Sequence, residues 1–163
     1  MKIIFLFFAG IISIQSASAQ LKTTPVCPPL VVDILEGNVN KLLSPKSTSG
    51  EVKKFFPCYT EAVEQNTGSG CIGVFYKDKD IYFYTERNYI EIRENFNGKL
   101  NPAIMGANRS SLFKLLGNPS IKDISWDAFQ TEYGTAVIYY DKTGKINKIQ
   151  VSSKGTESLK LCE

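Results

Sequence analysis

The chain has 163 residues, with 19 basic and 16 acidic side chains and no histidine. Its length suits one domain able to bury a core, and its apolar and aromatic content excludes a disordered chain. The formal charge of +3 is spread over interspersed signs, which offers no field for nucleic acid. The missing histidine excludes every catalytic scheme that needs imidazole, and most zinc sites.

Residues 1–19 have the pattern of an export signal. They hold no acid, one base (Lys2) and 13 apolar residues, and they end in Ala17-Ser18-Ala19, the small-x-small pattern that signal peptidase recognises. The apolar run is shorter than the roughly 20 residues that span a bilayer. We therefore expect cleavage between Ala19 and Gln20, with a retained N-terminal anchor as the alternative. The expected product is secreted or periplasmic.

The four cysteines are an even set in an exported chain, which favours two disulfides. Three pairings are possible. We favour Cys58–Cys71, which closes a short loop, together with Cys27–Cys162, which ties the two ends of the chain. A metal site is the alternative, but no Cys-x-x-Cys spacing and no histidine support it.

A nineteen-residue pattern occurs twice. Residues 83–101, FYTERNYIEIRENFNGKLN, align without a gap on residues 129–147, FQTEYGTAVIYYDKTGKIN, with seven identities. Both copies predict three consecutive antiparallel strands, and Gly98 and Gly144 can supply a positive φ in the last turn. The second and third strands are expected at Tyr89–Arg93 and Lys99–Ile104 in the first copy, and at Thr135–Tyr140 and Lys145–Ser152 in the second.

A short helix is predicted before each group of strands. Ser47-Thr48-Ser49 offers capping side chains for the first helix, which Pro57 ends. Asn108-Arg109-Ser110-Ser111 offers them for the second, which ends at Gly117-Asn118-Pro119. In both segments apolar residues follow at the i, i+3 and i+4 spacing of a helix with one buried face.

These elements predict an α+β fold of tandem helix-plus-antiparallel-strand units, with the helices packed on one face of an antiparallel sheet. One compact domain is expected overall. Its expected parts are a signal peptide (1–19), an N-terminal arm (20–43) with a strand or short helix at Leu30–Leu35, a first unit (44–104) with an extra strand at Ile72–Lys77, a second unit (106–153) and a C-terminal tail (154–163).

Two motifs in residues 106–146 resemble a known superfamily. The segment GANRSSLFKLLGNP (106–119) has the pattern of a helix that ends in Leu-Gly-x-Pro, and YDKTGKI (140–146) has the pattern of an aspartate–glycine hairpin. Both are similar to the β-lactamase-inhibitory proteins and to the small lipoproteins of the outer-membrane barrel-assembly machine. The resemblance implies tandem helix-plus-sheet units, a short-range disulfide that Cys58–Cys71 would match, and protein binding through the open sheet face. It transfers no functional residue.

No catalytic residue is assigned. The serines have no histidine to activate them, and Ser111-x-x-Lys114 is explained more simply as a capping serine and a surface lysine. Asp78 and Asp80 suit a turn between strands, where aspartate forms local hydrogen bonds. We therefore expect a protein that is not an enzyme, with no cofactor and no bound metal.

Alternating aromatic residues are the one positive signal for function. If Ile81 and Phe83 face the helices, the tyrosines between them face outward, as do residues of the same phase on the next strand. Tyrosine, tryptophan and arginine dominate binding hot spots. The expected binding residues are Tyr82, Tyr84, Tyr89, Arg93, Trp126 and Tyr139. The alternative interpretation is ordinary cross-strand packing, with the arm 20–43 covering this face.

The sequence therefore favours a secreted or periplasmic module that binds another protein, as an inhibitor or an immunity-like protein, and is itself a monomer. The alternatives are a cell-envelope assembly or structural accessory protein, and a glycan or small-molecule binder. Neither nucleic acid nor a stable membrane anchor is expected.

Overall fold

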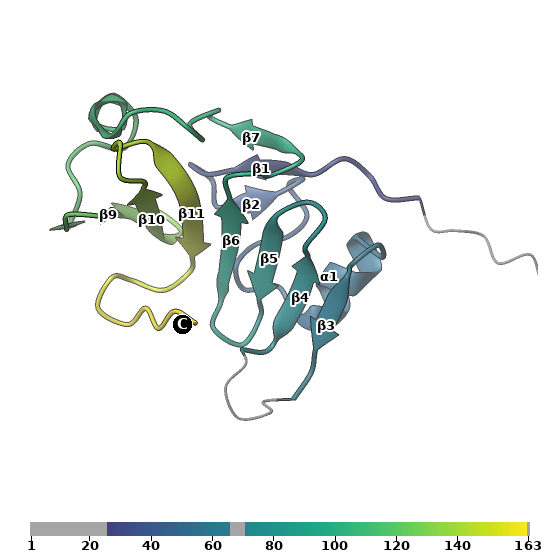
Figure 1. Ribbon diagram of the computed structural model, residues 1–163. Coiled ribbons are helices and arrows are strands. Elements are labelled where there is room, and N and C mark those ends of the chain that lie inside the picture. The colour runs from purple at the N-terminus through teal and green to yellow at the C-terminus, as the bar shows by residue number, and fades with distance from the viewer. Residues whose placement is uncertain (1–25, 66–70, 163) are drawn as a thin grey trace, which may run out of the picture.

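The computed structural model describes residues 26–65 and 71–162, which form two β-sheets (Figure 1). The predicted signal peptide and its cleavage site lie outside the described residues. The small sheet has the order β2 (Asn38–Val39), β1 (Val31–Asp33), β7 (Lys99–Asn101). The large sheet has the order β3 (Glu61–Val63), β4 (Gly73–Tyr76), β5 (Ile81–Tyr84), β6 (Tyr89–Arg93), β11 (Ile146–Ser152), β10 (Gly134–Tyr140), β9 (Trp126–Thr131), β8 (Ile121–Lys122).

The predicted α+β fold of tandem helix-plus-strand units is wrong, because the protein is mostly β. Helix α1 (Ser49–Phe55) has seven residues, and α2 (Phe113–Leu116) has four after a three-residue 3-10 turn, Arg109–Ser111. Both helices form where the sequence predicts them, but their stop signals leave them too short to cover a sheet. The strands of the small sheet supply much of that cover instead.

The ends of the helices show which local signals act. Thr48 caps α1 in a capping box with Glu51, as the serine-threonine run predicts. Gly117 ends α2 with a φ of +73°, also as predicted. Asn108 differs from the prediction, since its side chain forms no capping hydrogen bond.

The two copies of the sequence repeat form equivalent hairpins, but their third strands pair differently. Strands β5–β6 and β9–β10 pair antiparallel in both copies, and Phe83 and Phe129 are both buried. The third strands diverge: β7 leaves the large sheet and pairs in parallel with β1, whereas β11 pairs with both β10 and β6. The β6–β11 ladder thus turns the two expected units into one continuous sheet, and it leaves no unpaired edge between them.

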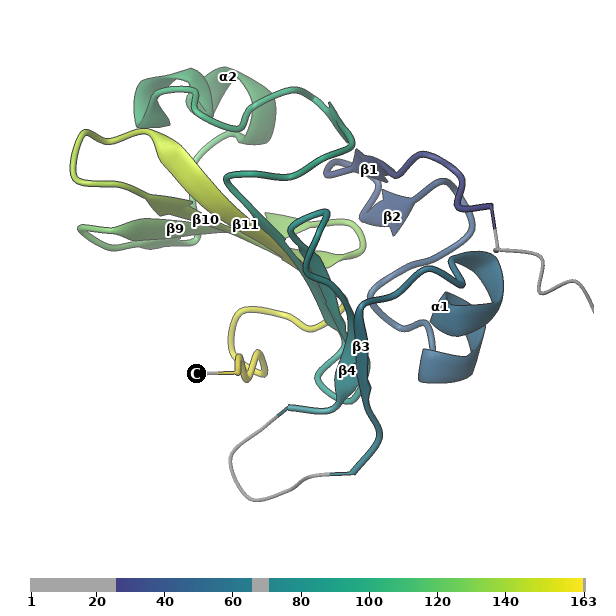
Figure 2. The ribbon, with the colours of Figure 1, turned by 45° about the vertical axis from the view of Figure 1, so that its right-hand side comes forward.

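Residues 26–43 form part of the core and not an irregular arm. Leu30, Val32, Ile34, Val39 and Leu43 are buried in one cluster with the inward-facing residues of the large sheet. Strand β1 therefore lies over one face of that sheet, together with β2 and α1 (Figure 2). We call this covered side the inner face, and the opposite side the outer face.

Two glycines of the expected turns have different reasons to be glycine. Gly144 has a φ of +76°, the conformation that the hairpin predicts. Gly98 does not need a positive φ. A Cβ at Gly98 would lie 2.7 Å from the carbonyl oxygen of Leu30, so glycine is required by the close approach of the chain that enters β7 to the N-terminal segment.

The disulfide pairing differs from the predicted one. Cys27 pairs with Cys58 and Cys71 pairs with Cys162, each with 6.0 Å between the Cα atoms. The predicted Cys58–Cys71 and Cys27–Cys162 bonds are wrong because the N-terminal segment packs on the inner face, whereas the C-terminal tail runs along the outer face. Each terminal segment is therefore fastened on its own side of the sheet.

Two disulfides are consistent with an extracellular or periplasmic protein. Within residues 26–65 and 71–162, no helix has the length and apolar character needed to cross a membrane.

The pairing is testable by peptide mapping without reduction. Because all four cysteines are bonded, thiol titration of the denatured, unreduced protein is expected to find no free thiol. Proteolysis and mass spectrometry are expected to recover Cys27 linked to Cys58 and Cys71 linked to Cys162. A peptide that joins Cys58 to Cys71 would overturn the pairing.

Candidate functional site

The six predicted binding residues all lie on the outer face of the large sheet. Cross-strand pairing places Tyr84 opposite Tyr89, and places Arg93, Lys148, Tyr139 and Trp126 side by side across four strands. Tyr82 shares this face, since it lies two residues before Tyr84 on β5. The prediction that these residues share one face of the sheet is therefore confirmed. The prediction that their side chains are all exposed is wrong.

The C-terminal tail covers part of this face. The backbone N–H of Cys162 donates to the hydroxyl of Tyr89 over 2.9 Å, and the hydroxyl of Thr135 donates to the carbonyl of Lys154 over 2.8 Å. Leu159 and Leu161 line a cavity of about 150 Å³ together with sheet residues. The tail therefore covers the sheet here, whereas the alternative interpretation assigned this role to the arm.

Two of the six residues are buried and cannot contact a partner directly. Tyr89 is 1% exposed and stacks on Tyr84 with 4.4 Å between ring centroids, and Tyr82 is 9% exposed beneath the guanidinium of Arg93, 4.1 Å away. Burial raises the pKa of the Tyr84 phenol. Tyr84, Trp126 and Tyr139 are half-buried, and Arg93 is exposed. Of the six predicted binding residues, only these last four therefore keep accessible side-chain surface.

A polar network crosses the outer face and leaves no free carboxylate in it. Glu91 is 3% exposed, and its two oxygens accept hydrogen bonds of 2.6 Å each from Arg93 Nε and Gln150 Nε2. The hydroxyl of Tyr139 donates to Gln150 Oε1 over 3.0 Å. Because both Glu91 oxygens are engaged, the network holds β6, β10 and β11 together.

A second surface gathers around α2, where large apolar side chains are exposed. Phe113 is 61% exposed, Leu115 45% and Ile124 94%. Two exposed lysines, Lys114 and Lys122, lie among them in the sequence. We call these five residues the α2 surface. In Figure 2, α2 and the C-terminal end lie on opposite sides of β9–β11, so the tail does not cover it.

Sequence reasoning missed the α2 surface, although a signal for it is present. The run Leu112-Phe113-Lys114-Leu115-Leu116 is apolar at four of five positions, which is more than one short turn can bury on one side. Leu112 is 1% exposed and Leu116 packs against the core, so Phe113 and Leu115 are left facing solvent.

A groove of about 420 Å³ lies beside α2, between the helix and strands β8 and β9. Leu112, Phe113, Pro119 and Phe129 contribute its apolar lining. Its charged lining residues are Arg109, Lys122 and Asp127. Apolar side chains therefore share the lining about equally with polar and charged ones.

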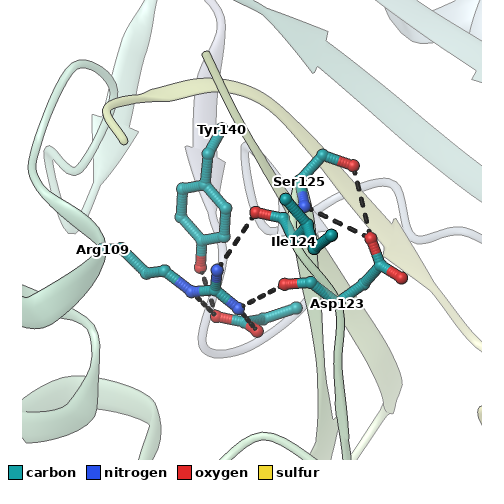
Figure 3. Close-up of polar contacts among 6 residues, drawn as sticks. Arg109, Asp123, Ile124, Ser125 and Tyr140 are labelled. Atoms are coloured by element: carbon teal, nitrogen blue, oxygen red, sulfur yellow. Dashed lines mark hydrogen bonds and ion pairs between the residues drawn. The ribbon is translucent and has the colours of Figure 1, made fainter. Parts of the chain in front are cut away.

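Arg109 fastens the α2 region to the sheet at the base of this groove. It forms an ion pair with Asp127, with a hydrogen bond of 2.9 Å from Nε, and its Nη atoms donate to the carbonyl oxygens of Asp123 and Ile124 over 2.7 and 3.2 Å (Figure 3). The hydroxyl of Tyr140 donates to Asp127 Oδ2 over 2.7 Å.

The electrostatics of this cluster favour a charged Arg109 and a neutral Tyr140. The hydrogen bond to Asp127 raises the pKa of the Arg109 guanidinium, and burial followed by the hydrogen bond to Asp127 raises the pKa of the Tyr140 phenol. Asp127 is 3% exposed and fully engaged. The hydrogen bonds and the ion pair of this cluster therefore hold the loop that carries Ile124 in place.

The other residues weighed from the sequence make local contacts. The hydroxyl of Ser111 donates to the carbonyl of Asn108 over 2.7 Å, so it does not cap the helix as the sequence predicts, since a capping side chain accepts a helix N–H. Asp80 accepts the backbone N–H of Asn95 over 3.0 Å and the hydroxyl of Tyr82 over 3.2 Å. Across the described part of the chain, no group of three or more cysteine and acidic side chains could hold a metal ion.

Comparisons with protein-family models, with curated proteins and with solved structures found no match. The resemblance to the β-lactamase-inhibitory proteins and the assembly lipoproteins stays a prediction. Its structural implications, tandem helix-plus-sheet units and a Cys58–Cys71 bond, do not hold in this fold.

The ion pair at the groove base is expected to contribute to folding stability. Asp127→Ala leaves the half-buried Arg109 and the buried Tyr140 without their shared acceptor, and we expect it to lower the free energy of unfolding by about 2–3 kcal/mol. The matched control is Asp123→Ala, which keeps the carbonyl that Arg109 binds and is expected to cost less than about 1 kcal/mol. Urea unfolding of both variants tests this, and equal losses would contradict the role of Asp127.

The burial of Tyr89 leads to a second expectation. Tyr89→Ala removes a buried ring, its stack on Tyr84 and its contact with the tail, and should cost about 3–4 kcal/mol in thermal or urea unfolding. Tyr59→Ala removes the same atoms from a ring that is 40% exposed, so a loss below about 1 kcal/mol is expected. A small effect at Tyr89 would mean that the tail leaves this face open in solution.

Proposed function

We propose that the mature chain is a secreted or periplasmic, non-enzymatic protein-binding module, inhibitor-like or immunity-like in its mode of action, and that it binds its partner through the α2 surface. The exposed part of the outer face, around Arg93 and Tyr139, would lie outside this contact. The partner would be held in a stoichiometric complex and not converted.

The exposure of Phe113, Leu115 and Ile124 is the observation that carries this proposal. All three lie within a twelve-residue stretch, Phe113 lines the groove, and the most exposed of the three is 94% accessible. Single exposed apolar residues are ordinary, but a group of them around a groove is typical of a binding site. Desolvation of such side chains by a partner is favourable, at about 25 cal/mol for each Å² removed from water.

The rigidity of the support adds to this argument. Arg109 fastens the Ile124 loop to Asp127, and Leu112 anchors α2 in the core. A surface that is already ordered loses less conformational entropy on binding than a mobile one. The bonding of Glu91 and Asp127, whose carboxylate oxygens are all engaged, favours a binding role over acid–base chemistry.

Glycan binding is the second candidate function, and a separate feature favours it. A concavity of about 520 Å³ on the outer face is lined by Arg93, Tyr139, Asn147 and Lys148, among others. The ammonium of Lys148 lies 3.9 Å from the centroid of the Tyr139 ring. Since Trp126 is the cross-strand neighbour of Tyr139, a glycan bound here would change the tryptophan fluorescence.

Affinity capture with paired variants tests the proposed protein-binding function. Mature chain 20–163 is the bait, and the source organism's envelope and secreted fractions are the prey. We expect one saturable partner whose retention falls at least tenfold with Phe113→Ser, because the substitution removes the largest exposed ring of the α2 surface.

The matched control for this experiment is Leu42→Ser, which changes an apolar residue that is 58% exposed next to the small sheet. It is expected to retain the partner in full. Equal retention by the wild-type chain and the Phe113→Ser variant would contradict binding through the α2 surface.

A further inference from the structure

The charge distribution around α2 indicates which kind of partner segment this surface would bind. Residues 95–122 contain four basic residues and no acidic one, a stretch that includes α2 and most of the groove lining. The basic residues are Lys99, Arg109, Lys114 and Lys122. The first acid that follows is Asp123, whose carboxylate accepts the backbone N–H of Ser125 within its own turn, over 3.2 Å.

Among the described residues that line the groove, one charged side chain lacks a counter-charge. Arg109 and Asp127 form an ion pair, so their charges compensate each other. Lys122 also lines the groove, and within residues 26–65 and 71–162 its ammonium has no ion-pair partner. The groove therefore combines an apolar lining with one uncompensated positive charge at β8, and exposed Lys114 adds a second on α2.

We infer that the partner presents a peptide segment with a large apolar side chain flanked by carboxylates. This inference rests on the proposed function and specifies its partner. The apolar side chain lies in the groove against Phe113 and Pro119, and a neighbouring carboxylate pairs with Lys122. Charge complementarity of this kind increases the association rate. It also disfavours basic segments, because Asp127, the one acid among the described lining residues, is already paired with Arg109.

An anionic lipid surface shares part of this chemistry but fits the shape less well. A bilayer offers a broad, nearly flat surface, whereas Phe113, Pro119 and Phe129 line a concave groove of about 420 Å³. A side chain that projects from a peptide segment can enter such a groove, whereas a membrane surface does not. The observations therefore favour a protein segment.

Three capped pentapeptides test the inference on the intact mature protein: Glu-Glu-Phe-Glu-Glu, Lys-Lys-Phe-Lys-Lys and Glu-Glu-Ala-Glu-Glu. Binding is followed by NMR titration of backbone amides. We expect the first peptide to bind at least tenfold more tightly than either of the others, with the shifted amides within residues 109–129. Comparable affinities for the first two peptides, or shifts centred on the outer face, would overturn the inference.

Charge reversal supplies the matched pair of variants. Lys122→Glu is expected to lower the affinity for the peptide Glu-Glu-Phe-Glu-Glu at least tenfold. Lys46→Glu makes an equal charge change on an exposed lysine before α1 and is expected to leave this affinity unchanged. An equal loss in both variants would show a nonspecific charge effect and overturn the inference. So would a Phe113-dependent association with phosphatidylglycerol vesicles that is tighter than peptide binding.

Failure of the inference and failure of the proposed function give different results. If the captured partner depends on Phe113 but the basic peptide binds as well as the acidic one, the function stands and the acidic segment is excluded. If partner capture is indifferent to Phe113, the proposed function itself fails, whatever the peptides do.

Discussion

The ladder between β6 and β11 is the contact on which the rest of the structure depends. Five residue pairs, from Lys148–Arg93 to Ser152–Tyr89, join two groups of four strands that would otherwise each have an open edge. The same ladder aligns Ile90 and Ile92 with Val151 and Ile149 on the inner face. It therefore sets both the continuity of the sheet and the apolar floor on which the small sheet packs.

Each face of this sheet is covered, at least in part, by one terminal segment of the chain. The N-terminal segment covers the inner face with β1 and β2 and is held by Cys27–Cys58, and the tail covers part of the outer face and is held by Cys71–Cys162. Each disulfide stabilises its segment mainly by restricting the unfolded chain, by about 2–4 kcal/mol. The covered parts are thereby removed from the surface available to a partner.

The surface left open has two chemically different parts. On the outer face, Arg93 and Lys148 lie over tyrosine rings beside a network whose carboxylate is already satisfied. Around α2, by contrast, Phe113 and Ile124 are exposed next to a groove with one uncompensated positive charge. Apolar side chains in water gain most from being covered, which is why the α2 surface and not the outer face carries the proposed function.

The amino-acid sequence by itself determined the local elements of this protein. Capping at Thr48, the stop at Gly117 and the strand Tyr89–Arg93 follow from propensities and turn chemistry that act over a few residues. Only the tertiary structure decided which strand β7 joins, which face each end of the chain covers, which cysteines meet, and that Tyr82 and Tyr89 are buried while Phe113 is exposed. Those outcomes depend on contacts between residues far apart in the chain, because the burial and the pairing of a strand or helix are decided by what packs against it. The periodicity of residues within a strand or helix shows only that one of its sides is apolar.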